Sequence, residues 1–476
     1  MKVRVRIAPS PTGNNLHIGN LYTALINWTF ARQNKGKFIV RIEDTDKDRY
    51  VKGAEKKILQ TLKDYGLDYD ESLDKKGKFG PYRQSQRLEI YKKHALSLVD
   101  KGQAYFCTCS KERLDQVRKD QQQQKKVPQY DRFCLNKQTD VKKQIKTGKK
   151  YVIRLKVPKG REIVFEDLLR GKISFQSNDV DDQVLLKSDG YPTYHLAVVV
   201  DDNLMEISHV IRAEEWISSV PKHILLYDAF GWKKPIFSHV PLLRNSDKSK
   251  LSKRKNPVWA SWYLEKGYLK EAVINYLCLM GWAHPQEKTI FPLAEFIKHF
   301  KLEKVSPAGP IFDLKKLDYI NGVYIRNTDD EKLATLIKPF LKFKIEDKKL
   351  NKIIPLIKER IVTLSDASDL IDFFEKEIKY NKKLLLHKKA ESRLVKEQLE
   401  AVYKELEKLT EWNLKNIAFS MQNLCEKNNW HRGQFFMALR VAVTCKTISP
   451  PLFESMEILG KEKTLQRIKI ALKKLS

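Results

Sequence analysis

The alternation of apolar and polar residues over the first fifty positions predicts a strand, a helix and a second strand. Residues 3–7 alternate between aliphatic and basic side chains, which is typical of a strand. Apolar residues then recur at helical spacing over residues 21–28, and Gly36 is suited to end that helix. Residues 38–42 form the next apolar run. A strand–helix–strand unit of this length predicts a Rossmann-type parallel sheet with a right-handed crossover.

The middle of the chain interrupts and then resumes this pattern. Residues 87–192 hold short strand-like runs and a polar tract with four consecutive Gln residues. We interpret this stretch as an insertion into the sheet domain. Residues 196–200 and 207–212 return to apolar, strand-like patterns, which predict the second half of the sheet.

The C-terminal part of the chain has a different composition. Beyond about residue 328 it is rich in Lys, poor in Gly and helical in periodicity. Residues 366–378 and 391–409 are predicted to be amphipathic helices. The predicted fold class is therefore α/β: a Rossmann-type parallel-sheet domain with an insertion, followed by an all-α C-terminal region.

The turn after the first predicted strand carries the first chemical signal. It ends in His17-Ile18-Gly19-Asn20 and lies between the carboxyl end of a strand and the start of a helix. Open parallel sheets bind ligands at that edge, and a helix N-terminus favours phosphate. Gly19 allows a nucleotide to approach the backbone closely, and His17 can donate a hydrogen bond to a phosphate oxygen. Taken alone, the motif is more often a tight turn with a structural histidine than a nucleotide site.

A second signal lies far downstream, at residues 250–254, which read KLSKR. A lysine-rich segment is usually a solvated surface. In combination with the histidine turn, Lys250 and Lys253 predict a different role. A loop with two ammonium groups can close over a triphosphate and neutralise the charge that develops on the α-phosphate and on the leaving pyrophosphate.

The charge of the chain adds a partner to this picture. The 476 residues include 90 Lys and Arg against 59 Asp and Glu, a formal net charge of +31, which favours a nucleic acid. Solvated lysines from a lysine-rich genome are the alternative. No apolar run approaches the roughly 20 residues that span a bilayer, and the N-terminus lacks the apolar core of a signal peptide. We therefore expect a cytoplasmic protein without membrane contact.

Four further motifs lie between the two signals: RIEDTD at 41–46, GPYRQS at 80–85, DGYPTYH at 189–195 and IRAEEW at 211–216. Together with residues 6–20 and 250–254, they resemble in order the motifs of the bacterial glutamyl-tRNA synthetases. The family's HIGH and KMSKS signatures are present here as HIGN and KLSKR. The resemblance covers essentially the whole chain, and several motifs in the right order are far more specific than any one of them.

This resemblance implies a class I aminoacyl-tRNA synthetase, a glutamate–tRNA ligase of protein synthesis. Such an enzyme uses ATP, with Mg²⁺, to attach L-glutamate to the 3′ end of tRNA(Glu) through a glutamyl-adenylate. Neither step needs a protein nucleophile, so catalysis rests on positioning and charge stabilisation. Because glutamate carries two carboxylates, its pocket should hold fixed positive charge, and a guanidinium can bind a carboxylate bidentately.

The resemblance also implies roles for individual residues. Arg6 would bind the side-chain carboxylate of glutamate, Arg212 and Tyr194 would complete the pocket, and Glu43 would attract the ammonium group. The implied glutamate-binding set is Arg6, Ala8, Ser10, Glu43, Tyr194 and Arg212. The implied ATP-binding set is Thr12, His17, Gly19, Asn20, Ala213, Glu215, Trp216, Lys250, Ser252 and Lys253, of which His17, Lys250 and Lys253 would be catalytic.

The cysteines of the predicted insertion are candidates for a metal site. The six Cys of the chain suit reduced thiols or a metal better than disulfides. Cys107 and Cys109 are two residues apart and Cys134 follows 25 residues later, which suits tetrahedral zinc. Three thiolates need a fourth ligand, and the C-x-C followed by Y-x3-C pattern of many family members implies Tyr130. Some relatives have a His two residues after the last Cys, where this chain has Asn136. Three buried thiols without a metal are the alternative.

The resemblance implies five parts with distinct functions. They are the first catalytic half at 1–88, an acceptor-stem-binding insertion at 89–193, the second catalytic half at 194–245, a KMSKS-loop and stem-contact part at 246–329, and a helical anticodon-binding region at 330–476. Arg360 resembles an arginine that reads the last anticodon base. The C-terminal region lacks the alternating strands of the β-barrels in glutaminyl enzymes. We expect a monomer.

Four alternatives compete with this interpretation. A glutamyl enzyme that also charges tRNA(Gln) shares the fold and chemistry, and only a charging assay separates it. A relative that attaches glutamate to a modified base lacks the C-terminal helical region. A small nucleotidylyltransferase with an HxGH turn would need neither the insertion nor the second motif. A non-enzymatic tRNA-binding protein predicts loss of Arg6, His17 or Lys253, and all three are present.

Overall fold

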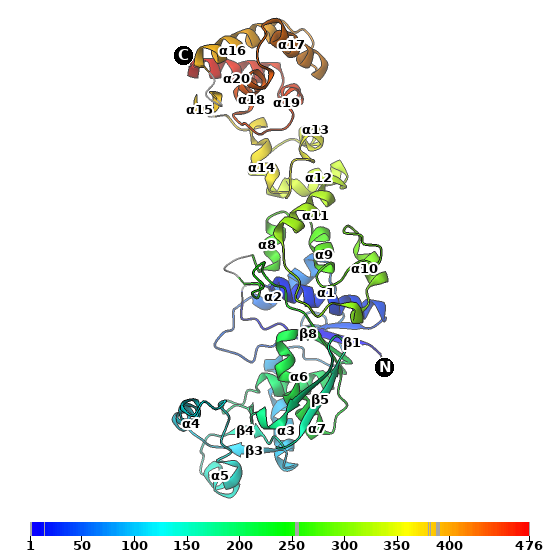
Figure 1. The fold of residues 1–476 in the computed structure, drawn as a ribbon, viewed down its shortest axis with the longest axis vertical. Coiled ribbons are helices and arrows are strands. Elements are labelled where there is room, and N and C mark those ends of the chain that lie inside the picture. The colour runs from blue at the N-terminus through cyan, green and yellow to red at the C-terminus, as the bar shows by residue number, and fades with distance from the viewer. Residues whose placement is uncertain are drawn as a thin grey trace. The chain divides into compact units, whose positions relative to one another are not determined.

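The computed structural model describes residues 2–13, 15–252, 257–378, 380, 382–386 and 391–475. These divide into two compact units. The first comprises Met1–Trp262 and Ile274–Asp313, and the second comprises Tyr263–Val273 and Leu314–Ser476. Figure 1 shows strands only in the first of these units, and the described residues of the second are helical. The predicted fold class, an α/β domain followed by an all-α region, is confirmed.

The first unit contains nine strands among its described residues. They are β1 (Arg4–Ile7), β2 (Lys37–Val40), β3 (Ala104–Cys107), β4 (Val152–Leu155), β5 (Glu162–Asp167), β6 (Gly171–Gln176), β7 (Val184–Leu186), β8 (His209–Ala213) and β9 (Ile236–Val240). β1 pairs with β2 in parallel, and β8 pairs with β9 in parallel. The Ser208 N–H donates to the Arg4 carbonyl over 2.9 Å, which joins the two pairs into one layer.

Helices cover this layer and form the rest of the first unit. They are α1 (Ile18–Gln33), α2 (Ala54–Asp64), α3 (Leu88–Asp100), α4 (Lys111–Gln123), α5 (Gln138–Lys146), α6 (Tyr194–Leu204), α7 (Val220–Phe230) and α10 (Leu293–His299). Two more, α8 (Ala260–Glu265) and α9 (Lys270–Cys278), include residues of both units. α1 is the crossover between β1 and β2, as the sequence pattern predicts.

The predicted insertion forms a small sheet and a hairpin. β3, β4 and β7 form an antiparallel sheet, and α4 and α5 flank it. β5 and β6 form an antiparallel hairpin, but β5 also pairs in parallel with β9, so the larger sheet has the order β6-β5-β9-β8. The inserted part therefore extends the same layer that carries β8.

Residues 196–200 were predicted as a strand, and that prediction is wrong. They lie in α6, where seven consecutive residues from Leu196 to Asp202 are buried. A short, continuous apolar run fits a fully buried helix as well as a buried strand, so periodicity cannot separate the two. The prediction for residues 207–212 is confirmed, because β8 begins at His209.

The basic residues of β1 are not on a solvent-exposed face. Arg4 and Arg6 are only 7% and 4% exposed. The Arg4 guanidinium donates two hydrogen bonds, of 2.8 and 3.0 Å, to the carboxylate of Glu71. β1 lies between β2 and β8, so both of its edges are paired, and α1 packs against it. All four of its residues are buried, and buried carboxylates neutralise its arginines.

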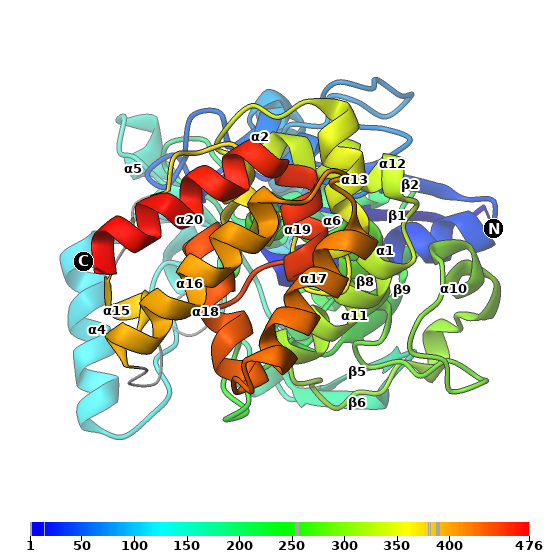
Figure 2. The same cartoon turned by 90° about the horizontal axis from the view of Figure 1, so that it is seen from above.

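The second unit consists of helices. They are α11 (Leu314–Arg326), α12 (Asp330–Ile337), α13 (Asp347–Ile357), α14 (Asp366–Ile371), α15 (Lys382–Leu385), α16 (Ser392–Glu407), α17 (Leu414–Lys427), α18 (Arg432–Thr444), α19 (Leu452–Leu459) and α20 (Lys461–Leu475). α20 packs against α16 and α18, as Figures 1 and 2 show. The helix predicted at 391–409 is confirmed. The one predicted at 366–378 is shorter, because α14 ends at Ile371 and a 3₁₀ turn over Asp372–Phe374 follows.

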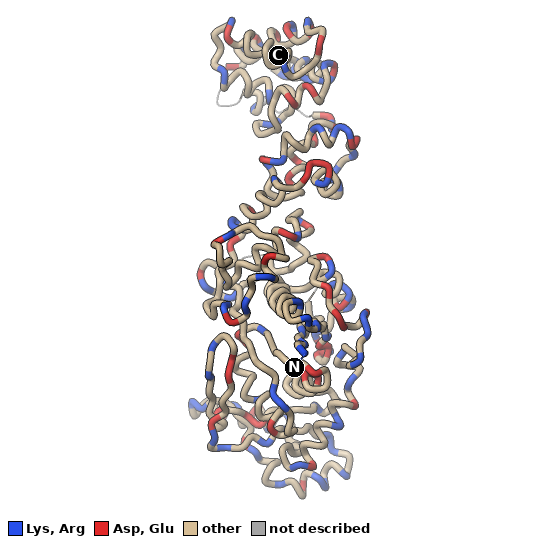
Figure 3. Tube along the Cα trace, turned by 90° about the vertical axis from the view of Figure 1, so that its right-hand side faces the viewer, with Lys and Arg blue, Asp and Glu red and all other residues tan. Residues whose placement is uncertain are grey.

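The charged residues are spread over both units. Figure 3 shows Lys and Arg along the whole trace, interspersed with Asp and Glu. Among the helices that the structure describes, none combines the length and the apolar character needed to cross a membrane.

Candidate active site

Two adjoining cavities lie at the carboxyl ends of β1 and β8. The first has a volume of about 110 Å³ and the second about 220 Å³. They share four lining residues: Asn20, Thr23, Ala213 and Glu215. Since ligands of parallel sheets bind at this edge, the two cavities are the candidate site.

The first cavity brings together most of the residues expected at glutamate. Five of the six line it: Arg6, Ala8, Glu43, Tyr194 and Arg212. Ser10, the sixth, is exposed and does not line the cavity. Trp216, expected at ATP, also lines this cavity and is 37% exposed, with its ring 4.5 Å from that of Tyr194.

Arg6 enters the cavity with two of its nitrogens already engaged. Its Nε and Nη2 each donate a 3.0 Å hydrogen bond to the carboxylate of Asp202, on α6. Arg41 Nη1 donates to the same carboxylate over 2.8 Å. Neither bond of Arg6 uses Nη1. Asp202 therefore fixes the direction of the Arg6 guanidinium by a bidentate contact.

A buried network of ion pairs lies behind Arg6. Arg41 is fully buried, and its nearest carboxylates are those of Asp202, Asp201 and Glu43 at 2.8, 3.5 and 3.5 Å. Arg87 donates to Asp201 over 2.7 Å. Three arginines thus face three carboxylates, and the attraction between them offsets the desolvation penalty of the buried charges.

Glu43 is the network member that faces the cavity. It is 8% exposed, and its Oε1 has no hydrogen-bond partner among the described residues. Burial raises the pKa of Glu43 to about 7, although Arg41 and Arg6 act in the opposite direction. An oxygen of this kind, buried and without a donor, is suited to accept hydrogen bonds from a ligand ammonium group.

Arg212 differs from Arg6 because neutral groups surround it. Its Nε donates to His239 Nε2 over 3.1 Å, and its Nη1 donates to the Tyr194 hydroxyl over 3.1 Å. Its Nη2 lies 3.3 Å from the Trp216 carbonyl and 3.4 Å from His223 Nδ1. Among the described residues no carboxylate is within ion-pair distance of Arg212. Arg6 is paired with a carboxylate, whereas Arg212 is not. Arg212 therefore carries the positive charge in this cavity that has no direct counter-ion.

The second cavity combines the histidine turn with the lysine segment. Six of the ATP-site candidates line it: His17, Gly19, Asn20, Ala213, Glu215 and Lys250. The backbones of the two regions are also hydrogen-bonded, because the Ile18 N–H donates to the Val258 carbonyl over 2.7 Å. The Ala260 N–H likewise donates to the Leu16 carbonyl over 2.8 Å. The turn and the chain that follows the lysine segment are thus held against each other.

His17 is the N-cap of α1. Its Nδ1 accepts a 3.0 Å hydrogen bond from the Gly19 N–H, which satisfies one of the free amides at the helix start. A neutral imidazole whose Nδ1 is an acceptor carries its proton on Nε2. His17 is therefore held in the tautomer that donates from Nε2, as a phosphate oxygen requires.

The lysine segment is anchored at its first residue. Lys250 forms an ion pair with Glu215. Leu251 is buried, and its N–H donates to the Leu243 carbonyl over 3.1 Å. Glu214, next to Glu215, accepts from Arg244 over 3.1 Å and from Arg170 over 2.6 Å, which braces the chain that leads to Lys250. Thr12 and Ser252 line neither cavity, and Lys253 lies outside the described residues.

Several residues at the site were missed by sequence reasoning. Asp202 and Asp201 end the apolar run that was interpreted as a strand, and a pair of acids after such a run was the only available signal. His223 and His239 carry no motif at all. Their proximity to Arg212 depends on the pairing of β8 with β9 and on the packing of α7, which sequence spacing does not reveal.

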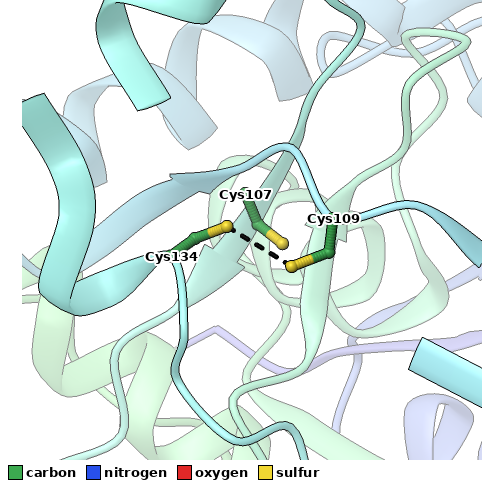
Figure 4. A group of neighbouring side chains, drawn as sticks. All are labelled: Cys107, Cys109 and Cys134. Carbon is green, nitrogen blue, oxygen red and sulfur yellow. Dashed lines mark hydrogen bonds between the residues drawn. The ribbon is translucent and has the colours of Figure 1, made fainter. Parts of the chain in front are cut away.

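Three cysteines and a tyrosine converge in the inserted part. The Sγ atoms of Cys107, Cys109 and Cys134 lie within 4.8 Å of one another, with Cys109 and Cys134 3.4 Å apart (Figure 4). The Tyr130 hydroxyl lies 3.4 Å from Cys107 Sγ and 3.3 Å from Cys109 Sγ. Zn–S bonds of about 2.3 Å place tetrahedral ligands slightly farther apart than the 3.3–3.4 Å separations of these atoms. The four groups therefore fit a zinc ion.

A second histidine cluster has a different character. His284 Nε2, Glu295 and His299 converge, but His284 Nδ1 accepts the Gln286 N–H over 3.1 Å. The proton of a neutral His284 is therefore on Nε2, 3.0 Å from Glu295, and the same carboxylate oxygen binds Lys288 at 2.6 Å. In this tautomer neither ring nitrogen of His284 has a free lone pair for a metal. We therefore interpret the group as a polar cluster that holds α10 in place.

Comparisons with known proteins agree with this geometry. Residues 2–319 match the family model described as the catalytic domain of class I tRNA synthetases for glutamate and glutamine. Residues 332–472 match the model described as an anticodon binding domain. The parallel sheet with its two joined cavities is thus the catalytic domain of a class I tRNA synthetase.

Full-length relatives narrow this class. The chain is 45% identical over 484 residues to a glutamate–tRNA ligase of Dehalococcoides mccartyi, with 100% of this chain and 98% of the relative covered. A crystal structure of a glutamate tRNA ligase from Elizabethkingia meningosepticum in complex with its amino acid matches at 36% identity and a TM-score of 0.90, with both chains fully covered. A glutamate–tRNA synthetase from Elizabethkingia anophelis matches at 37% identity and a TM-score of 0.87, with 99% and 100% covered. The chain belongs to the glutamate–tRNA ligase family.

Proposed function

We propose that this chain is a glutamate–tRNA ligase that attaches L-glutamate to the 3′ end of tRNA(Glu) through a glutamyl-adenylate. The observation that carries the proposal is a cavity with two arginines that shares four lining residues with a second cavity, which His17 and Lys250 line. The first suits a dicarboxylate and the second suits a triphosphate.

The amino acid occupies the first cavity in this proposal. The guanidinium groups of Arg6 and Arg212 attract the side-chain carboxylate, with the Tyr194 hydroxyl beside them. Glu43, whose Oε1 accepts no hydrogen bond from the part of the chain that the structure describes, receives the ammonium group. Ala8 leaves room for the substrate, and Ser10 adds a polar contact. Glutamine, which has no negative charge on its side chain, leaves the charge of Arg212 uncompensated and is bound more weakly.

ATP occupies the second cavity as its magnesium complex, in which Mg²⁺ neutralises part of the phosphate charge. His17 donates to a phosphate oxygen from Nε2, and Gly19 allows the nucleotide to approach α1. Lys250 and Lys253 stabilise the charge of the leaving pyrophosphate. The adenosine lies along Ala213 and Glu215, which line both cavities, and extends toward Trp216, which lines the first. Thr12, Asn20 and Ser252 complete the proposed ATP set.

The reaction follows from these positions. An α-carboxylate oxygen of glutamate attacks the α-phosphorus of ATP, the bond to the bridging oxygen breaks, and pyrophosphate leaves. A ribose hydroxyl of the tRNA 3′ end then attacks the acyl carbon, and AMP leaves with the electron pair of the acyl–phosphate bond. The site contributes orientation and a preorganised field, which are the main sources of rate in such transfers.

The rest of the chain serves tRNA in this proposal. Residues 89–193 contact the acceptor stem, 246–329 carry the lysine loop and stem contacts, and 330–476 bind the anticodon, while 1–88 and 194–245 form the catalytic halves. Arg360, an exposed residue after α13, reads an anticodon base. Burial lowers the pKa of Arg440, and the nearby positive charge of Arg360 lowers it further. The two cations are therefore neighbours in this region. A monomeric enzyme of the cytoplasm is proposed.

We also propose one structural zinc ion in the inserted part. Cys107, Cys109 and Cys134 would hold it, with Tyr130 in the fourth position. When bound, the ion would cross-link the strand β3 to the loop before α5, as structural zinc sites do.

The test is an ATP–pyrophosphate exchange and charging assay with glutamate and glutamine against tRNA(Glu) and tRNA(Gln). Glutamate-dependent charging of tRNA(Glu) is expected, with at most weak activity for glutamine. Charging of tRNA(Gln) with glutamate at a similar rate would identify the enzyme with relaxed tRNA selection. Absence of glutamate-dependent charging of either tRNA would overturn the proposal.

A further inference from the structure

We propose that Asp167 and His239 form a positioning pair that holds the Arg212 guanidinium toward the first cavity, so that glutamate selection depends on a carboxylate of the inserted hairpin. This inference rests on the proposed function, because it assigns a role within the same amino-acid pocket. Neither residue lines the cavity, and neither belongs to a motif that sequence analysis selected.

His239 is oriented by its two ring nitrogens. It lies on β9 and is fully buried. Its Nδ1 lies 2.6 Å from Asp167 Oδ2, and its Nε2 lies 3.1 Å from Arg212 Nε. A guanidinium can only donate, so His239 Nε2 must be an acceptor and the proton must be on Nδ1. Asp167, which can only accept when ionised, fixes this tautomer.

Asp167 is well placed for this role. It is the last residue of β5 and is 1% exposed. Its Oδ1 accepts the Leu169 N–H over 3.0 Å, so both carboxylate oxygens are engaged. Burial opposes ionisation, but the interaction with the His239 ring and the hydrogen bonds from the backbone N–H groups of Leu169 and His239 together outweigh it, so the pKa of Asp167 is lowered. The carboxylate therefore remains charged and holds the imidazole proton.

On the side of Arg212 that faces His223, the guanidinium is again the hydrogen-bond donor and a neutral histidine is the acceptor. His223 Nδ1 lies 3.4 Å from Arg212 Nη2, and His223 Nε2 lies 3.1 Å from His195 Nδ1. Donation from Arg212 to His223 and from His223 to His195 is consistent with two neutral rings. Burial lowers the pKa of His195 to about 3 and that of His223 well below its usual value, so both remain neutral.

The consequence is an arginine that is firmly oriented but not neutralised. Hydrogen bonds to His239, Tyr194 and His223 fix its plane, while Asp167 acts on it through the imidazole of His239. A carboxylate in direct contact would have competed with the substrate, as Asp202 does for Arg6. The arrangement keeps the Arg212 charge available for a ligand carboxylate, and it links the pocket to the β5–β6 hairpin.

The test measures charging rates while glutamate, ATP and tRNA are varied in turn. His239→Phe keeps a ring of similar size but removes the acceptor, and should raise the KM for glutamate about tenfold or more. The KM values for ATP and tRNA should stay within about twofold of wild type. His239→Gln restores an acceptor oxygen near the Arg212 Nε and should recover most of the loss. Asp167→Asn keeps an acceptor oxygen but removes the charge. Its KM for glutamate should lie between those of His239→Gln and His239→Phe.

Glu166→Gln is the matched control. It removes one carboxylate from the neighbouring position of β5, where the side chain is exposed on the opposite face, and should leave all three KM values unchanged. An unaltered KM for glutamate in His239→Phe would overturn the inference. So would an equal loss for all three substrates that His239→Gln does not repair, since this would indicate a purely structural role. If the wild-type enzyme failed to charge with glutamate, the proposed function itself would fail, and that outcome is distinct from these.

Discussion

The two arginines of the first cavity differ in how their charge is neutralised. Arg6 shares the carboxylate of Asp202 with Arg41, whereas Arg212 has only neutral acceptors around it. A substrate carboxylate gains most from the charge that has no direct counter-ion. Arg6 then serves as a second, fixed donor whose direction is set by α6. Both residues were predicted from the sequence by resemblance, but this difference between them was not, because it depends on residues outside any motif.

Arg6→Ala should reduce kcat/KM for glutamate in ATP–pyrophosphate exchange by about a hundredfold, because it removes a donor and leaves Asp202 with one buried partner fewer. Binding of tRNA, measured by filter binding, should be largely unchanged, since Arg6 is 4% exposed and inside the cavity. Unchanged exchange would exclude Arg6 from the glutamate pocket. Arg32→Ala is a suitable control for loss of an arginine, because Arg32 lies on α1, forms an ion pair with the half-buried Asp70 and lines neither cavity.

Glu43 predicts a pH dependence of glutamate binding. Burial raises the pKa of Glu43 to about 7, so the carboxylate is ionised above pH 7 and protonated below it. The ammonium group of glutamate loses its partner on protonation, and the KM for glutamate should rise as the pH falls from 8 to 6, approaching tenfold per pH unit below the pKa. Glu43→Gln should give a high KM that does not vary over this range. A wild-type KM that is flat between pH 8 and 6 would contradict the assignment.

At the scale of elements, the strand–helix–strand start of the chain was predictable because each piece has a clear period. The insertion was located from its change of composition, and the long amphipathic helix α16 from its spacing. The packing of β5 against β9 was not predictable, because hydrogen bonding between strands separated by about seventy residues leaves no local signal. α6 was mistaken for a strand for the related reason that a fully buried element loses its periodicity.

Gly36 tests the close contact between the turn that joins α1 to β2 and Val3, the residue before β1. It follows the end of α1, and a Cβ at this position would meet the carbonyl oxygen of Val3 and lie 2.8 Å from its Cβ. Backbone cannot yield cheaply, so Gly36→Ala should lower the free energy of unfolding by about 1–3 kcal/mol. The midpoint of urea unfolding, followed by tryptophan fluorescence, measures this.

Gly322→Ala is the paired control for that substitution. Gly322 lies within α11, where a Cβ would meet only the far end of the Arg326 side chain, at 3.1 Å. Alanine in a helix interior is favoured over glycine by about 0.5–1 kcal/mol, so this variant should be at least as stable as wild type. Equal destabilisation by both substitutions would show that the close approach of Gly36 to Val3 has no special role.

Cys109→Ser tests the zinc proposal. Protein purified after growth with zinc should contain about one zinc per chain, and the variant should contain much less, because a serine hydroxyl is a poor substitute for a thiolate. Its inserted part should become more accessible to protease, since the ion would connect β3 to the loop before α5. Cys445→Ser, in the second unit, should keep its zinc. The zinc proposal would be contradicted if the wild-type protein contained no zinc and a chelator did not change its protease sensitivity. The three thiols would then only be packed together.

At the scale of the whole molecule, net charge predicts how the enzyme meets its largest substrate. The chain carries a formal charge of +31, and its Lys and Arg residues occur on both units rather than in one cluster. The amino-acid pocket, by contrast, is an enclosed network in which most charges are paired. Salt screens exposed charges over about 10 Å at 0.1 M and affects buried pairs much less. The two substrates should therefore respond differently to ionic strength.

The KM for tRNA should rise about a hundredfold between 50 and 200 mM KCl if roughly four phosphates are contacted, because bound counterions are released when lysines replace them. The KM for glutamate, measured with tRNA held at saturation, should change by less than about threefold over the same range, since Arg212 and Glu43 are shielded by protein. A plot of log KM for tRNA against log salt gives the number of phosphate contacts from its slope. A slope near zero would mean that the excess charge is merely solvated, as a lysine-rich composition alone allows. A steep slope for tRNA with a flat one for glutamate would show that net charge governs encounter with the polyanion while the buried pocket governs selection of the amino acid.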